Sequence, residues 1–140
     1  MAALAARSAA AALPDVIFSI GTDNHSPAEF ALAKGAGWQQ YAAAFKDPVV
    51  FTVGVSKPER DWPYIHPNTH DKWAGGRKHP FTVRFSLPEA PTGAITLVVG
   101  QLNAWESPTL RLDVNGRELE RRPAPAGTGS ASGTAEDKAR

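Results

Sequence analysis

The sequence predicts an all-β domain, either a sandwich or a small barrel. Several short runs alternate apolar and polar residues with the period of two that is typical of β-strands, and few stretches have helical periodicity. The 12 Gly and 12 Pro residues supply connections between these runs. A chain of 140 residues can form one domain with a real core but is hardly long enough for two.

Five segments have strand character. The clearest is 81–87, where Phe, Val, Phe and Leu occupy one face and Thr, Arg and Ser occupy the other. The Asn115–Gly116 dipeptide predicts a β-hairpin, because both residues tolerate the positive φ of a type I′ turn. The predicted strands are residues 16–20, 49–55, 81–87, 94–100 and 110–114.

One or two short helices are also predicted. In residues 26–34, Ser26 is a suitable N-cap, Glu29 completes a capping box, and Gly35 ends the helix. Residues 37–45 place three aromatic side chains at helical spacing and form the second candidate.

The ends of the chain differ from its middle. Residues 1–14 are an Ala-rich lead-in whose apolar run is too short and too weak for a convincing signal peptide. Residues 122–140 contain no large apolar side chain, so burial cannot offset their ordering entropy. We therefore expect a folded domain over residues 15–121, followed by a disordered tail or linker over residues 122–140.

Composition excludes several classes of protein. The net charge of +1 argues against a dedicated nucleic-acid binder, which needs a clustered basic face. The chain has no Cys, which excludes disulfides, Cys-ligated metals and a cysteine nucleophile. No apolar run approaches the roughly 20 residues of a membrane-spanning helix.

Three stretches resemble a known family. They are "IGTDNHSPAEF" (20–30), "GWQQYAAAFKDPVVFTVGVSKPERDWPY" (37–64), and "FTVRFSL" followed by "LRLDVNG". In this order they are similar to the C-terminal module of rhamnogalacturonan lyases, polysaccharide lyase family 4, and the resemblance extends from Val16 to about Arg117. It implies a jelly-roll-like antiparallel β-sandwich of the galactose-binding-domain type.

The resemblance also implies a function. Such lyases cleave the rhamnose–galacturonate backbone of pectin by β-elimination, using a Lys and a His in a first domain that this chain lacks. No catalytic residue can be carried over. We expect a non-catalytic, extracellular module that binds pectic polysaccharide or packs on a lyase catalytic domain. The alternatives are a part of an active lyase whose catalytic domain is missing from this chain, or a purely structural module.

The loop "DWPYIHPNTHDKW" (61–73) carries the residue types that bind sugars. Aromatic rings stack on the C–H face of a pyranose, and fixed donors and acceptors bind its hydroxyls. Cationic groups suit acidic sugars, and Pro63 and Pro67 stiffen the loop. The candidate carbohydrate-binding residues are Trp62, Tyr64, His66, Asn68, His70, Lys72 and Trp73.

The same loop also has a structural interpretation. Trp62 can cap the open end of the core, while Asp61 accepts backbone N–H bonds in its turn. Trp73 and Tyr64 are as compatible with packing as with ligand binding. Trp38 and Trp105 lie beside apolar segments and are predicted to pack in the core or at its rim.

No cofactor is expected. His66 and His70 have the i, i+4 spacing of a metal pair, but Pro67 disfavours a regular helix through them, so we predict no metal ligands there. Hard oxygen ligands for a structural calcium ion occur at Asp23, Asn24 and Glu29, which we consider a minor alternative. Nucleophile elbows and phosphate-binding Gly loops are absent from the sequence.

Overall fold

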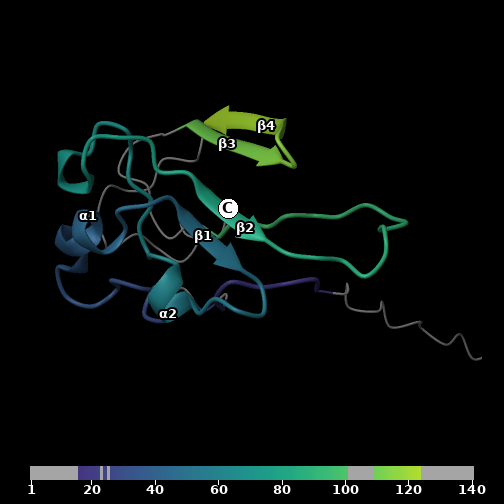
Figure 1. Cartoon of the computed structure of the whole chain (residues 1–140), viewed down its shortest axis with the longest axis horizontal. Coiled ribbons are helices and arrows are strands. Elements are labelled where there is room, and N and C mark those ends of the chain that lie inside the picture. Colours follow the sequence, from purple (N-terminus) through teal and green to yellow (C-terminus); the bar gives the residue numbers. More distant parts are fainter. Residues whose placement is uncertain (1–15, 23, 25, 101–108, 124–140) are drawn as a thin grey trace, which may run out of the picture.

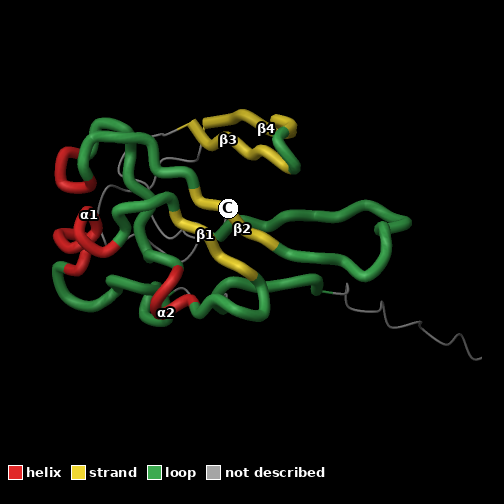
Figure 2. The backbone as a smooth tube through the Cα atoms, in the orientation of Figure 1, coloured by secondary structure: helices red, strands yellow, loops and turns green. Residues whose placement is uncertain are grey.

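The computed structural model describes residues 16–22, 24, 26–100 and 109–123 (Figure 1). Short strands and helices are joined by long loops (Figure 2), which agrees with a β-type domain that has little helix. Within the described part, no helix is long and apolar enough to cross a membrane. The elements are η1 (Gly37–Gln40), α1 (Tyr41–Ala44), β1 (Val49–Thr52), α2 (Pro58–Asp61), η2 (Lys72–Ala74), β2 (Phe81–Arg84), β3 (Thr109–Val114) and β4 (Arg117–Pro123).

Strands β1 and β2 form a two-stranded sheet, and they pair in parallel, with Val49 opposite Phe81 and Phe51 opposite Val83. For this pair the expected antiparallel arrangement is not observed. The connection between the strands contains α2 and η2 and carries the chain back to the starting edge, as a parallel pair requires.

The inward face of this sheet is the apolar face that the sequence predicted. Val49 and Phe51 are buried, and Phe81 and Val83 are half-buried, whereas Thr82 and Arg84 are exposed. Alternation along each strand therefore places one set of side chains in the core. Both strands end earlier than predicted.

The early end of β1 has a local cause. The backbone N–H groups of Val55 and Ser56 both donate to the carbonyl oxygen of Thr52, which closes a turn. Gly54 takes a φ of 83° in this turn, a left-handed conformation that favours glycine. Val55 is consequently 70% exposed instead of lying in the strand.

The helix predicted over residues 26–34 is wrong. The Ser26 hydroxyl does accept a bond from the N–H of Ala28, as an N-cap would, at 3.2 Å. However, the N–H of Ala31 donates to the carbonyl oxygens of Pro58 and Trp62, and Leu32 has a φ of 64°. Tertiary pairing has thus overridden helix propensity in this segment.

The helix predicted over residues 37–45 is confirmed in a modified form. A 3₁₀ turn, η1, continues directly into the single α turn α1, and Phe45 caps its end with an N–H bond to the carbonyl oxygen of Tyr41. This turn carries Trp38 and the buried Tyr41.

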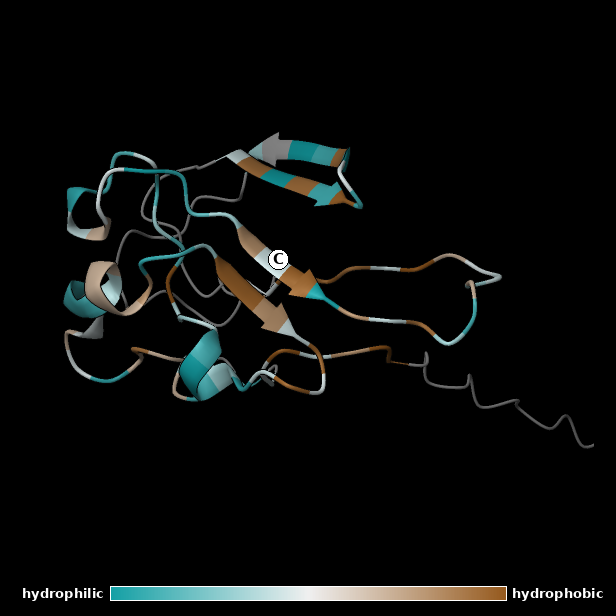
Figure 3. Ribbon diagram, in the orientation of Figure 1, coloured by the Kyte–Doolittle hydropathy of each residue, from teal (hydrophilic) through white to brown (hydrophobic). Residues whose placement is uncertain are grey.

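The predicted strands 16–20 and 94–100 do not pair with any strand in the described part of the chain. Both are described as irregular, and Val98 is 83% exposed. Residues 85–100 leave the end of β2 as a long excursion beyond the sheet (Figure 1), and several of its segments are hydrophobic (Figure 3). We call residues 85–100 the apolar arm. A strand pattern alone cannot form a strand without a neighbour to accept its backbone bonds.

Strands β3 and β4 form the predicted hairpin. They pair antiparallel, and Asn115 and Gly116 have φ values of 51° and 79°, as a type I′ turn requires. An irregularity in the register follows Leu112. Strand β4 extends to Pro123, two residues beyond the predicted end of the domain. Residues 1–14, the predicted tail from residue 124 onward, and Trp105 lie outside the described residues.

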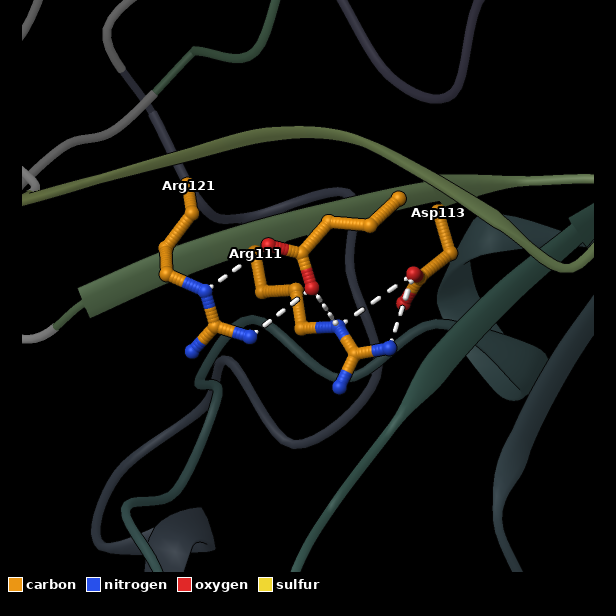
Figure 4. Close-up of polar contacts among 4 residues, drawn as sticks. Arg111, Asp113 and Arg121 are labelled. Carbon is orange, nitrogen blue, oxygen red and sulfur yellow. Dashed lines mark hydrogen bonds and ion pairs between the residues drawn. The ribbon is translucent and has the colours of Figure 1, made fainter.

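An exposed ion-pair network joins the two strands of the hairpin (Figure 4). Glu118 accepts bonds from Arg111 at 3.0 Å and from Arg121 at 2.8 Å, and Arg111 also pairs with Asp113 at 2.9 Å. The Arg121 hydrogen bond is the main cause that lowers the pKa of Glu118. Because these charges are solvent-exposed, they contribute little to stability and chiefly keep the hairpin surface polar.

Candidate functional site

The loop 61–73 divides into two parts that do different things. Its first part, residues 61–66, begins at the last residue of α2 and packs on the β1–β2 sheet. Its second part, residues 68–73, forms a tight turn and enters η2, which packs against η1 and α1. The predicted site residues are therefore not all on one surface.

Asp61 has the structural role proposed for it. Its carboxylate accepts the backbone N–H of Lys57 at 2.8 Å, so it closes the first turn of α2. It also accepts two bonds of 2.7 Å from the guanidinium of Arg60. The Arg60 bond and the Lys57 N–H lower the pKa of Asp61. This carboxylate orients the chain entering the loop.

Trp62 is a packing residue. Its ring contacts Phe51 edge-on with centroids 5.9 Å apart and Phe81 edge-on at 5.0 Å, so it bridges β1 and β2. Its carbonyl oxygen accepts the N–H of Ala31, and the N–H of Tyr64 donates to the Ala31 carbonyl oxygen. Pro63 between them is fully buried. Trp62 and Tyr64, both half-buried, thus belong to the sheet side of the domain.

His66 ties the loop to the start of β2. Its Nε2 donates to the carbonyl oxygen of His79 at 2.5 Å, and its ring lies 4.3 Å from that of Phe81. The Nε2–H is fixed by this bond, because a carbonyl oxygen only accepts. Both imidazoles are exposed, but His66 contacts Phe81 and the chain before β2, whereas His70 lies on the turn that follows.

The carboxylate of Glu29, one of the calcium candidates, accepts bonds from the Thr22 backbone N–H and the Asn24 side-chain amide. Asp23 lies outside the described residues. Among the residues that are described, no three His, Asp or Glu side chains group closely enough to hold a metal ion.

Asn68 and Asp71 build the turn before η2. The N–H of Asn68 donates to the Asp71 carboxylate at 2.6 Å, and the N–H of Asp71 donates to the Asn68 carbonyl oxygen at 3.1 Å. The Asn68 side-chain oxygen accepts the N–H of His70 at 3.4 Å. This reciprocal pattern fixes the turn and leaves the side chains of His70 and Lys72 exposed.

Trp73 meets Trp38 at this end of the domain. Their rings are edge-to-face, with centroids 5.5 Å apart, and Trp73 makes a second edge contact of 5.9 Å with Tyr41. Trp38 is 37% exposed and Trp73 is half-buried. We call the set Trp38, Asn68, His70, Lys72 and Trp73 the η2 corner.

The prediction of Trp38 as core or rim packing missed its place in the η2 corner. The sequence does hold a signal: side chains three apart eclipse in a 3₁₀ turn, so Trp38 of η1 and Tyr41, which caps it, lie on the same face. That face meets Trp73.

Beneath the η2 corner, the buried ring of Tyr41 packs with those of Phe45 and His79, and we call these three residues the Tyr41 cluster. Tyr41 is 1% exposed, stacks on Phe45 with centroids 5.4 Å apart, and contacts the ring of His79 edge-on at 5.2 Å. The Arg77 guanidinium donates to the carbonyl oxygens of Phe45 and Lys46 at 2.9 and 2.6 Å. Burial raises the pKa of Tyr41, and the nearby Arg77 partly opposes this.

His79 makes the Tyr41 cluster sensitive to acid. It is 6% exposed, and its Nε2 has no hydrogen-bond partner. Burial lowers the pKa of His79 below its ordinary value of 6.5, the charges of Arg77 and His66 lower it further, and Asp71 opposes them. The folded protein therefore holds this ring neutral at a pH where the unfolded chain is already protonated.

We expect the free energy of unfolding to be insensitive to His79 well above pH 6.5 and to fall as the pH drops below 6.5 toward the lowered folded pKa. Urea denaturation of wild type and His79→Phe across this range measures it. The variant should lose this part of the pH dependence, whereas the exposed control His70→Phe should keep it. Equal slopes for wild type and His79→Phe would contradict the assignment.

The surface chemistry of the η2 corner indicates a class of protein. An exposed aromatic side chain bordered by amide, imidazole and ammonium groups has the residue types that a carbohydrate-binding-like module uses. The chain matches the family described as CBM-like, polysaccharide lyase family 4, domain III, over residues 16–140, and it belongs to this family. The family predicted from the sequence is thereby confirmed. Comparisons with curated proteins and with solved structures find no match.

Proposed function

We propose that the chain is a non-catalytic carbohydrate-binding module of a rhamnogalacturonan-lyase-type protein and that it engages pectic polysaccharide at the η2 corner. Membership of the CBM-like family supports a carbohydrate-binding role. The observation that carries the choice of surface is the edge-to-face pair of Trp38 and Trp73, because Trp38 is 37% exposed there.

The chemistry of the η2 corner suits an acidic sugar. An indole face stacks on the C–H face of a pyranose, and edge contacts with Trp38 and Tyr41 hold Trp73 in place. Lys72 and His70 supply donors for a uronate carboxylate, and Asn68 supplies an amide for hydroxyls. In this proposal Trp62, Tyr64 and His66 support the loop from the sheet side.

A single exposed corner of this kind binds weakly. We expect dissociation constants from high micromolar to millimolar, which corresponds to roughly −4 to −6 kcal/mol. Repeated sugar units and attachment to an enzyme raise the effective concentration, so weak binding is sufficient for retention on a polymer.

The test is isothermal titration with rhamnogalacturonan oligosaccharides, together with ultraviolet detection of unsaturated uronide. Wild type should release heat without new absorbance. Trp73→Ala should weaken binding by about tenfold or more, because the substitution removes the aromatic face on which the sugar stacks. The control Trp73→Phe keeps an aromatic face and should retain most of the affinity.

The outcomes separate the candidate functions. New absorbance would mean lyase activity in this chain and would overturn the non-catalytic proposal. Equal affinity of wild type and Trp73→Ala would remove the η2 corner as the site. Neither heat nor absorbance would favour the second candidate.

That second candidate is packing on a lyase catalytic domain, and the apolar arm favours it. Leu97, Val98 and Val99 are 49%, 83% and 53% exposed, an unusual apolar stretch for a free surface. Val98→Lys should abolish co-elution with a family 4 catalytic domain, while Thr96→Lys on the same arm is the matched control. Unchanged co-elution of Val98→Lys would count against this candidate.

We further propose a jelly-roll-like sandwich for the complete domain and an extracellular location. Membership of a CBM-like polysaccharide lyase family supports both, since a β-type domain fits the sandwich and a polysaccharide substrate fits an extracellular location. The two described sheets are each two-stranded, so a sandwich requires additional strand pairing.

A further inference from the structure

A second concave surface lies beside η1, away from the residues of the η2 corner. It is an open hollow of about 370 Å³, a size suited to one small-molecule unit. Apolar and polar side chains both line it, and none of them was predicted as a site residue. The residues that matter to the argument are Phe30, Leu32, Lys34, Gly37, Gln40 and Glu59.

The 3₁₀ geometry of η1 places the hollow and the η2 corner on different faces of the same turn. Residues three apart eclipse in such a turn. Gly37 and Gln40 are three apart and both line the hollow. Trp38 and Tyr41 are also three apart, and both contact Trp73. This turn therefore separates the hollow from the η2 corner.

The backbone around the hollow is held in an unusual conformation. Leu32 has a φ of 64°, which is uncommon for a residue with a bulky side chain. A Cβ atom on Gly37 would overlap the carbonyl oxygen of Leu32, so only glycine permits this close approach. The N–H of Gly37 donates to the carbonyl oxygen of Lys34 at 3.2 Å and closes the wall of the hollow.

The aromatic wall is similarly constrained. A Cβ atom on Gly21 would overlap the ring of Phe30, so Gly21 provides the room in which this ring sits. Ala31, the next residue, is buried and held by backbone bonds to the segment around Trp62. Strained backbone that the surroundings hold in place is a common feature of ligand sites.

The lining chemistry fits a neutral pyranose. The half-buried ring of Phe30 offers an apolar face, Gln40 and Lys34 donate hydrogen bonds, and the carboxylate of Glu59 accepts them from hydroxyl groups. Lys34 and Glu59 carry opposite charges, so the lining has no net charge and suits a neutral sugar unit better than a uronate. We propose that this hollow is a second saccharide subsite, which binds a neutral sugar unit while the η2 corner takes an acidic one. The inference rests on the proposed function in that both ligands are saccharides.

The experiment is a backbone-amide NMR titration with two separate probes, a neutral methyl galactopyranoside and its uronate counterpart. The neutral glycoside should shift amides at residues 34, 37, 40 and 59, and the uronate should shift those at residues 70–73. Gln40→Ala should weaken the neutral glycoside by about fivefold, the effect of one lost hydrogen bond. Gln39→Ala is the matched control, because Gln39 is the same residue type on the same turn but does not line the hollow.

The outcomes distinguish the subsite from the proposed function. Shifts only at residues 70–73 would overturn this subsite and leave the proposed function standing. Shifts only around the hollow would support the subsite and remove the η2 corner. No shift at either surface would overturn both, and equal weakening by Gln39→Ala and Gln40→Ala would mean a general effect on η1 and would overturn the subsite.

Discussion

Replacing Tyr41 by Ala is expected to lower the free energy of unfolding by about 3–5 kcal/mol. Tyr41 is 1% exposed and has three aromatic neighbours, Phe45, Trp73 and His79, with ring centroids 5.2–5.9 Å away. Removing the ring leaves a cavity that these neighbours cannot close, because each is anchored by its own segment. A loss of this size is a large fraction of the total stability of a small domain.

Urea denaturation followed by tryptophan fluorescence measures this loss. Tyr41→Phe is the control, because it keeps the ring and its volume and should cost less than about 1.5 kcal/mol. The same truncation should also weaken saccharide binding at the η2 corner, since Trp73 loses one of its two edge contacts. Similar stability of Tyr41→Ala and wild type would show that the packing of the Tyr41 cluster does not stabilise the domain.

The sequence predicted those elements whose formation depends on nearby residues. Alternation in 81–87 and 49–55 gave the faces of β1 and β2 correctly, and Asn115–Gly116 located the hairpin turn. The failures involve distant partners. Residues 26–34 have good helix signals, yet Ala31 bonds to residues near Trp62, and no local pattern indicates such a pairing. The segment 94–100 has a strand pattern without a paired neighbour.

The candidate site was predictable in composition but not in arrangement. The loop 61–73 does carry an aromatic and polar surface, but its composition could not distinguish the sheet-facing Trp62 from Trp73 at the η2 corner. Trp38 lies far from the loop in the sequence, and only the packing of η2 on η1 brings it to Trp73. The hollow beside η1 depends on the left-handed Leu32, which residue patterns do not predict.

Replacing Trp62 by Ala is expected to lower the free energy of unfolding by about 3 kcal/mol. The ring bridges Phe51 of β1 and Phe81 of β2, so its loss opens the covered face of the sheet. Since Trp62 is half-buried, the loss should fall at the lower end of the range for buried aromatic residues. Thermal and urea denaturation measure it, and Trp62→Phe should recover most of the stability.

The binding of the Trp62→Ala variant distinguishes support from contact. Titrated at a temperature where the variant is still folded, it should bind rhamnogalacturonan oligosaccharides within about twofold of wild type, because truncation of a side chain away from the ligand leaves affinity nearly unchanged. Trp73→Ala should show the opposite pattern, with lost affinity and a smaller loss of stability. If Trp62→Ala instead loses binding while its melting temperature is unchanged, the sugar lies on the sheet side, and the stretch 61–66 that packs there becomes the surface to map.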